Sequence, residues 1–307
     1  MSGLLASLQG AVAQGVLWGI MVLGVYITYR LMDIADLTVD GSFALGACVC
    51  AVLVVNKRVD PVVALLVSAM AGLAAGAVTG ILHTFFEIPA ILAGILTQIS
   101  LWSINLRLMG GKSNIPLLKV ETLISKFVKM TGLTQSQASM IIGIIAAIII
   151  ILFLYWFFGT EIGSALRATG NNEDMVRALG VNTKMTKLLA LTLSNGLVGL
   201  SGALVCQSQK YGDITLGTGA IVIGLASIVI GEVLMGRLTS FYWKLTSVVV
   251  GSIVYFVIRA LVLRMGLDAN DMKLLSAIIV ALALSFPVVL TKYRMRKEYS
   301  EGDEEEC

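Results

Sequence analysis

The stretch Ala138–Phe158, with the sequence ASMIIGIIAAIIIILFLYWFF, runs for 21 residues without a charged side chain. An α-helix rises 1.5 Å per residue, so about 20 apolar residues are needed to cross roughly 30 Å of hydrocarbon. Inside a bilayer every backbone N–H and C=O must be bonded within the segment, and a helix achieves this. The stretch therefore predicts a transmembrane helix.

Eight further apolar runs reach this length or nearly reach it, which predicts about nine transmembrane helices, in a range of eight to ten. These runs are Ala11–Tyr29, Leu37–Val55, Pro61–Leu82, Pro89–Leu108, Leu188–Cys206, Gly219–Met235, Trp243–Leu263 and Met272–Leu290. The fold class is thus an all-α polytopic membrane protein. Leu37–Val55 and Gly219–Met235 begin beside aspartates or glycines, so we expect these two to be short or broken helices that line a path.

The composition excludes several other classes of protein. Hydrophobic residues make up 57% of the 307 residues and charged residues only 13%, whereas a soluble domain carries about a quarter charged residues. A net charge of only +3 provides no basic surface for nucleic acid. The single histidine, His83, and four cysteines without zinc-ribbon spacing indicate no metal site and no catalytic histidine.

Basic residues beside the last predicted span set the orientation. The charged tail, residues 291–307, is rich in Lys and Arg near the span end, which predicts a cytoplasmic C-terminus. Counting back through nine spans places loop 160–187 inside, and loop 109–137 and the N-terminus outside. The helical apolar spacing of Leu117–Met130 suggests a helix on the outer face.

A short segment recurs in the two halves of the chain. Asp36–Gly46, DLTVDGSFALG, returns as Asp213–Gly224, DITLGTGAIVIG, with one residue inserted. Span counting gives the copies opposite orientation, which is typical of inverted-topology repeats. We expect a single transmembrane domain, 1–290, with a first repeat at about 11–109 and a second at about 188–290.

Inverted repeats predict a translocation path where the two broken spans meet near the membrane midplane. Small residues there let backbones approach closely, and polar side chains are available for contact with a zwitterion. The candidate path residues are Asp40, Gly41, Ser42, Gln98, Asn195, Thr215 and Gly219. Ionisable residues within spans are few, which is unlike a proton-driven carrier. Glu232 and Arg259 are near predicted span ends, where we expect them to snorkel or to form ion pairs.

The polar segment Glu161–Asn182 carries a predicted short helix of about two turns. Asn171 or Asn172 is positioned to cap it, and Gly180 is positioned to end it. A helix this short is marginal alone and needs a docking partner. The candidate docking residues are Arg167, Asn171, Asn172, Glu173, Asp174, Met175, Arg177, Leu179 and Gly180.

The motifs GSALRATGNNE at 163–173, ALGVN at 178–182, and DGSFALGA at 40–47 resemble the permease subunits of bacterial ABC importers of the branched-chain amino acid and ribose type. DLTVDGS at 36–42 and EIPAILAGILT at 87–97 look most like the branch associated with tryptophan or tyrosine uptake and a substrate-binding lipoprotein. The resemblance runs from about residue 16 to residue 290.

The resemblance implies that segment 163–182 is a coupling helix that contacts a separate ATP-binding subunit. ATP and Mg²⁺ are then used by that partner, and this chain binds no cofactor and is not an enzyme. The other implied partners are a second permease subunit, as a homodimer, an extracytoplasmic substrate-binding lipoprotein, and a small solute, expected to be an aromatic or branched-chain amino acid. The implied location is the bacterial inner membrane.

Several alternatives stay open at this point. One is a secondary carrier or facilitator that works without an ATPase. Another is the vitamin-capturing subunit of an energy-coupling transporter, and a membrane enzyme is a more distant alternative. For the solute, a sugar or nucleoside is the alternative to an amino acid.

Overall fold

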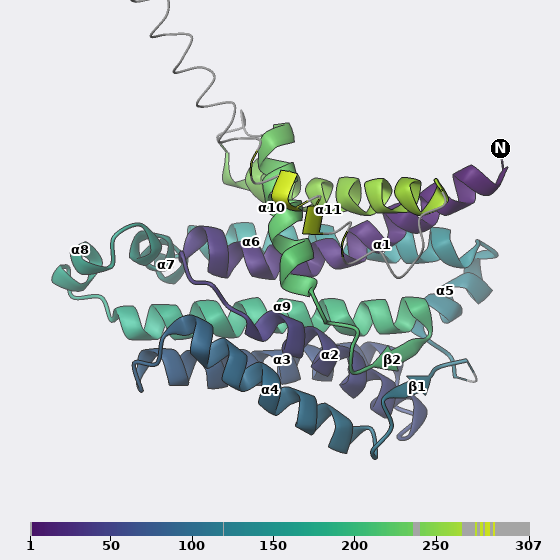
Figure 1. The fold of residues 1–307 in the computed structure, drawn as a ribbon, viewed down its shortest axis with the longest axis horizontal. Coiled ribbons are helices and arrows are strands. Elements are labelled where there is room, and N and C mark those ends of the chain that lie inside the picture. Colours follow the sequence, from purple (N-terminus) through teal and green to yellow (C-terminus); the bar gives the residue numbers. More distant parts are fainter. Residues whose placement is uncertain are drawn as a thin grey trace, which may run out of the picture.

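The computed structural model describes residues 2–118, 120–235 and 240–265, together with positions 274, 277, 278, 280–282 and 285. The elements in chain order are α1 (Ser2–Tyr26), the π-helical turn η1 (Ile27–Leu31), α2 (Thr38–Val55), α3 (Pro61–Thr84), α4 (Ala90–Leu108), β1 (Asn114–Pro116), α5 (Leu123–Thr131), α6 (Gln135–Gly159), α7 (Glu161–Asn171), α8 (Glu173–Ala178), α9 (Thr183–Gln209), β2 (Tyr211–Asp213), α10 (Ala220–Met235) and α11 (Phe241–Arg264). The long helices lie roughly along one direction (Figure 1).

Among the described residues, seven helices are long and apolar enough to cross a membrane: α1 with η1, α2, α3, α4, α6, α9 and α11. The all-α polytopic prediction is thereby confirmed. Gly219–Met235 becomes α10, an apolar helix of only 16 residues, in line with the expectation of a short helix there. The ninth predicted span, Met272–Leu290, and the tail, 291–307, lie outside the described residues apart from the few positions named above.

Glycines allow the central helix α9 to pack closely against its neighbours. A Cβ added at Gly46 of α2 would lie 2.0 Å from the carbonyl oxygen of Gly199, and one at Gly72 of α3 would lie 2.2 Å from the carbonyl oxygen of Asn195. A Cβ at Gly202 would meet the carbonyl oxygen of Phe43 at 2.1 Å. Lipid provides no hydrophobic driving force for helix association, so small residues stabilise these crossings by allowing close van der Waals packing of the backbones. These contacts fix α2, α3 and α9 as one block.

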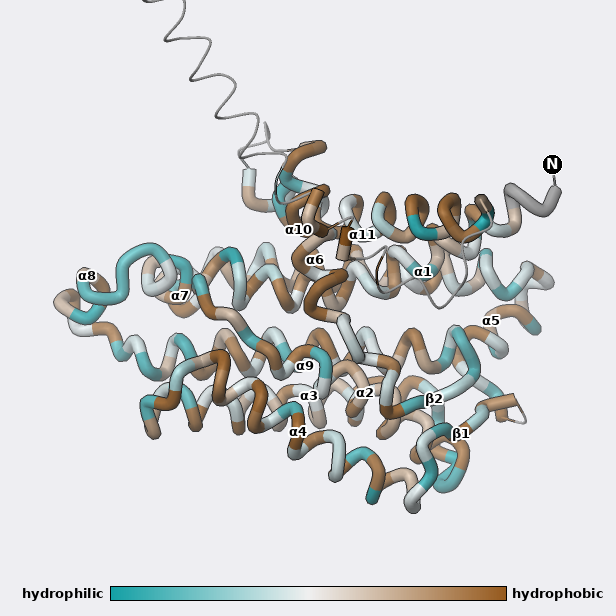
Figure 2. Tube along the Cα trace, viewed as in Figure 1, coloured by the Kyte–Doolittle hydropathy of each residue, from teal (hydrophilic) through white to brown (hydrophobic). Residues whose placement is uncertain are grey.

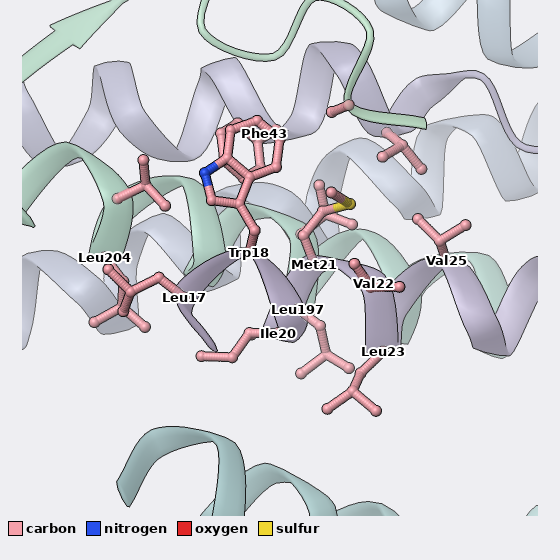
Figure 3. Close-up of a cluster of buried hydrophobic side chains, with 14 of the residues drawn as sticks. Leu17, Trp18, Ile20, Met21, Val22, Leu23, Val25, Phe43, Leu197 and Leu204 are labelled. Atoms are coloured by element: carbon pink, nitrogen blue, oxygen red, sulfur yellow. The ribbon is translucent and has the colours of Figure 1, made fainter. Parts of the chain in front are cut away.

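The second half of α1 supplies much of the core. Its side chains from Val16 to Tyr26 include many that are fully buried, and the helix packs against α6, α9 and α11. Figure 3 shows Trp18 beside Phe43. The two ring centroids are 4.5 Å apart and the ring planes are tilted by 34°. Trp18 also lies 5.5 Å from the ring of Phe256 in α11. This aromatic group joins α1 and α2 to α11, which lies about 200 residues further along the chain.

Polar structure gathers at the two ends of the helical bundle (Figures 1 and 2). One end carries α7 and α8, and the other carries α5, the β1–β2 pair and the start of α1. The two strands are antiparallel, with Ile115 opposite Gly212. The N-terminus therefore lies on the side of loop 109–137 and opposite loop 160–187, which is the relative arrangement that span counting predicts.

The prediction of a helix over Leu117–Met130 is wrong in its first half. The helix begins only at Leu123, where Thr122 forms a capping box with Ser125. Before it, the backbone N–H of Leu117 donates to the carbonyl of Lys210 at 2.8 Å, and the Leu117 side chain is fully buried. Pairing with the β2 strand thus takes precedence over helical spacing in this segment.

Candidate functional site

The α2 helix begins beside a buried carboxylate. Asp36 is 3% exposed, and its Oδ1 accepts the backbone N–H of Thr38 at 2.9 Å. Its Oδ2 accepts a hydrogen bond from Nδ2 of Asn195 in α9 at 2.7 Å. A carboxylate at a helix N-terminus satisfies otherwise unpaired N–H groups and complements the helix dipole. Asp36 therefore ties the start of α2 to the middle of α9.

Asp40, in the first turn of α2, joins this helix to α10. Its Oδ2 accepts the backbone N–H of Gly219 at 2.8 Å, and its Oδ1 accepts that of Ile221 at 2.9 Å. Near the other end of α10, Glu232 pairs with Arg30 of η1 at 2.7 Å. The N-termini of α2 and α10 thus meet at one carboxylate within the bundle.

A chain of threonine hydroxyls lies behind this junction. Thr38 of α2 contacts Thr79 of α3 at 2.8 Å between the hydroxyl oxygens, and Thr79 donates to Thr97 of α4 at 2.9 Å. All three side chains are buried. Each hydroxyl has a partner, so the network satisfies buried polar groups. It fixes the start of α2 against both α3 and α4.

The segment before α10 repeats the local geometry of the segment before α2. Oδ1 of Asp213 accepts the backbone N–H of Thr215 at 2.7 Å, just as Oδ1 of Asp36 accepts that of Thr38. Both are turns in which an aspartate bonds its own backbone two residues on. The two recurring sequence segments therefore share a turn, and each turn leads toward a short helix.

A cavity of about 940 Å³ lies between α1, the β2–α10 segment, α10 and α11. Its described lining includes Gln14, Trp18, Gln209, Tyr211, Asp213, Thr215, Leu216, Thr218, Gly219, Val222, Ile223, Arg259 and Ala277. The lining thus reaches from the β2 strand to Gly219, the residue that Asp40 holds. Its size falls within the range typical of sites for small molecules.

At the opposite end of the bundle, α8 begins at a capped turn. The side chain of Asn172 accepts the backbone N–H of Met175 at 3.0 Å, so Asn172 is the N-cap and Asn171 is the last residue of α7. Gly180 follows the helix with φ of +86°, a backbone conformation that favours glycine. The short helix is therefore placed as the sequence predicts. Helix α7 before it was not expected.

Glu173 anchors α8 to its neighbours. One carboxylate oxygen accepts from Arg177, one turn along α8, at 2.8 Å, and the other accepts from Lys187 of α9 at 2.5 Å. The hydrogen bond from Lys187 is the main cause that lowers the pKa of Glu173, and the charges of Lys187 and Arg177 add to it. Arg177 also donates to the hydroxyl of Thr183 at 3.3 Å. This small cluster fixes α8 on the start of α9.

The predicted docking residues divide into an outward and an inward group. Met175 is 52% exposed and Leu179 is 74% exposed, and Asp174 is exposed beside them. Val176 was also expected on this exposed apolar surface, but it is buried, because its side chain faces the bundle. Arg167 turns toward the bundle, where its guanidinium lies 5.3 Å from the centre of the Phe241 ring. The outward group forms an apolar knob on a polar end of the molecule.

The family model for the "Branched-chain amino acid transport system / permease component" matches residues 7–286. The match covers nearly the whole of the described chain. The chain belongs to this permease family. The permease is accordingly an integral membrane subunit of an ABC-type transport system and is not itself an enzyme. Such systems imply an ATPase and a substrate-binding protein as partners.

Curated relatives of the permease include transport proteins of known type. It is 38% identical over 281 residues to the tyrosine transport system permease protein of Clostridioides difficile (strain R20291), covering 91% of this chain and 90% of that protein. It is 29% identical over 205 residues to the autoinducer 2 import system permease protein LsrC of Salmonella typhi, covering 64% of this chain and 55% of that protein. No solved structure matches the chain.

The predicted path residues of the permease are only partly brought together. Thr215 and Gly219 line the cavity, and Asp40 reaches it through Gly219. Asn195 is fully buried and bonds Asp36. The remaining three residues lie around the start of α2, and none of them is among the described residues that line the cavity. These are Gly41, which packs on the backbone of Gln98; Ser42, which is buried without a hydrogen bond from any described residue; and Gln98, which is half-buried.

Sequence reasoning missed the aromatic and charged walls of the cavity. Trp18 gave no signal beyond its place in an apolar span, and Tyr211 precedes the recurring segment rather than forming part of it. Glu232 forms an ion pair near a helix end, as expected. Arg259 lines the cavity instead. The one sequence signal for this position was a charged residue placed before the end of an apolar span.

Proposed function

We propose that the permease is the membrane-spanning subunit of an ATP-driven importer for an amino acid, coupled through α8 to a separate ATPase. The observation that carries this proposal is the knob of Met175 and Leu179, which exposes apolar side chains on a polar end of the molecule. Exposed apolar groups on a polar surface mark contact sites for other proteins. The anchoring of α8 to α9 through Glu173 and Lys187 gives a rigid route from that contact into the bundle.

The proposed arrangement places α7 and α8 in the cytoplasm, with the C-terminus on the same side and the β1–β2 end outside the cell. Two copies of the permease form a homodimer in the bacterial inner membrane. The ATPase binds ATP and Mg²⁺, and the permease binds no cofactor. An exported lipoprotein delivers the solute to the β1–β2 end. The relative named for tyrosine transport supports an aromatic amino acid as the solute, ahead of a branched-chain amino acid, a sugar or a nucleoside.

The coupling role is tested in proteoliposomes that hold the permease, its ATPase and the binding protein, with ATP hydrolysis and tyrosine uptake measured together. Arg177→Glu reverses the charge that pairs with Glu173. Gly180→Pro cannot adopt the φ of +86° that ends α8. Both variants are expected to hydrolyse ATP with little uptake, so that more ATP is used for each solute moved.

Matched control variants carry the same exchanges at the β1–β2 end, where a defect in lipoprotein docking lowers uptake and ATP hydrolysis together and so leaves their ratio unchanged. Lys112→Glu reverses an exposed charge in loop 109–137, and Gly132→Pro alters the glycine that ends α5 with φ of +70°. Neither control is expected to change the ratio of ATP to solute. Normal uptake and stoichiometry in both α8 variants would remove α8 from coupling. Uphill uptake by the permease alone on an ion gradient would favour a secondary carrier instead.

A further inference from the structure

The cavity between α1, β2, α10 and α11 contains one cation without an acidic partner among the described residues. Arg259 of α11 is half-buried, and its guanidinium lies 5.7 Å from the centre of the Phe256 ring. No described carboxylate forms an ion pair with it. An ionisable side chain within an apolar span is costly and usually serves a function. Arg259 is thus available to an anionic group in the cavity.

Asp213 supplies an anion to the same cavity. Its Oδ1 accepts from Thr215, and its Oδ2 accepts from Nδ2 of Asn114 at 3.0 Å. Both donors are neutral, and no described lysine or arginine pairs with this carboxylate. A carboxylate accepts about four hydrogen bonds, so Asp213 is fixed in position and retains capacity for a cationic donor.

Tyr211 lines the same cavity as both charges. Burial raises the pKa of its phenol, the charge of Asp213 raises it further, and the charge of Arg259 opposes that rise. The cation and the anion therefore act on one side chain in the cavity wall.

The cavity also holds polar atoms without a partner. Nε1 of Trp18 and Oε1 of Gln209 are buried and form no hydrogen bond with any described residue, and both residues line the cavity. Buried donors and acceptors are nearly always paired in native proteins. The Trp18 ring is held by Phe43 and Phe256 at 4.5 and 5.5 Å (Figure 3). A donor and an acceptor on a fixed aromatic wall are suited to a bound solute.

We propose that this cavity is a solute-recognition site within the permease, where Arg259 binds the α-carboxylate of an amino acid and Asp213 binds its α-ammonium. Trp18 and Tyr211 then flank the side chain of the solute. This inference rests on the proposed import function and adds that the membrane subunit itself selects zwitterions. A neutral sugar or nucleoside carries no charge opposite to that of either side chain, so it forms only the weaker neutral hydrogen bonds here.

Binding of three probes to the purified permease in lipid nanodiscs, without ATPase or binding protein, tests this site. The probes are L-tyrosine, tyramine, which lacks the carboxylate, and 3-(4-hydroxyphenyl)propionate, which lacks the ammonium. Saturation-transfer NMR gives the affinity of each. Because each charged contact is strong, we expect each analogue to bind about ten-fold more weakly than L-tyrosine.

The variants give a cross-check that a general structural defect cannot imitate. Arg259→Gln is expected to weaken L-tyrosine about ten-fold and leave tyramine unchanged. Asp213→Asn is expected to weaken L-tyrosine similarly and leave the propionate unchanged. The controls are Arg264→Gln and Glu121→Gln, which are exposed and are not among the described lining residues. Arg259→Lys keeps the cation and serves if the glutamine variant does not fold.

Equal binding of all three probes, or equal weakening of all three by each variant, would overturn the inference. Import of tyrosine by the complete transporter with no binding to the nanodisc permease would also overturn it, and would leave the proposed function intact. Charge-dependent binding without ATP-driven import would support this binding site and reject the proposed importer function.

Discussion

Replacing Asp40 by Asn tests whether one carboxylate holds α2 and α10 together. Its two oxygens accept the backbone N–H groups of Gly219 and Ile221 at 2.8 and 2.9 Å. In the Asp40→Asn variant one oxygen becomes an NH₂ group that faces a backbone donor, so one buried N–H loses its partner. Hydrogen bonds to a charged group contribute about 1.5–3 kcal/mol each and neutral ones about 0.5–1.5 kcal/mol. We therefore expect a loss of roughly 2–4 kcal/mol in the free energy of unfolding.

The loss is measured as a shift in the thermal unfolding of the purified permease. Cys48, Cys50 and Cys206 are free and buried, so a thiol-reactive dye reports when the core opens. At about 2 °C per kcal/mol, the melting temperature is expected to fall by about 4–8 °C. Asp33→Asn is the control, because Asp33 is exposed just after η1 and has a φ of +53° that Asn tolerates. Equal melting temperatures for the wild type and the Asp40 variant would refute the reasoning.

Two further predictions concern packing and pH. Gly46→Ala is expected to destabilise the permease by about 1–3 kcal/mol, because its Cβ would lie 2.0 Å from the oxygen of Gly199; Gly10→Ala, which meets no atom within 4 Å, should have no such cost in the same dye assay. Lys187 lowers the pKa of Glu173, so the stabilisation by this pair is present above the unfolded pKa of about 4.3 and is lost as pH falls through the folded value. The difference in melting temperature between the wild type and Glu173→Gln should thus be constant from pH 7 to about pH 5 and shrink below about pH 4. A difference that grows on acidification would contradict the assigned ion pair.

The sequence predicted those parts of the structure that depend on local pattern. Long apolar runs such as Ala138–Phe158 identify their helices because a bilayer leaves the backbone no other solution. The cap was narrowed to Asn171 or Asn172 and the glycine at 180 was predicted, since capping depends on a few adjacent residues. Helix α7 was missed because its polar composition resembles a connector. The Leu117 segment was misread because its partner strand lies about a hundred residues further along the chain.

The candidate site was predicted less well, for a physical reason. The ends of the Asp40 contact are 179 residues apart, and no local pattern reports such pairing. The recurrence of Asp36 and Thr38 at positions 213 and 215 gave a partial signal, since it identified two segments that share a turn. Arg259 was expected to snorkel because many span-end arginines do so. Only the packing of α1, β2 and α11 around it shows that it faces a cavity.

Helix α9 is a continuous helix that connects the two ends of the molecule. Its 27 residues span about 40 Å at 1.5 Å per residue. One end begins beside α8, the middle holds Asp36 through Asn195, and the far end places Gln209 in the cavity wall. Under the coupling proposed above, a displacement of α8 is transmitted along α9 as a rigid body, because close glycine contacts join α9 to α2 and α3. The displacement of Gln209 in the cavity wall then equals that of the end of α9 beside α8.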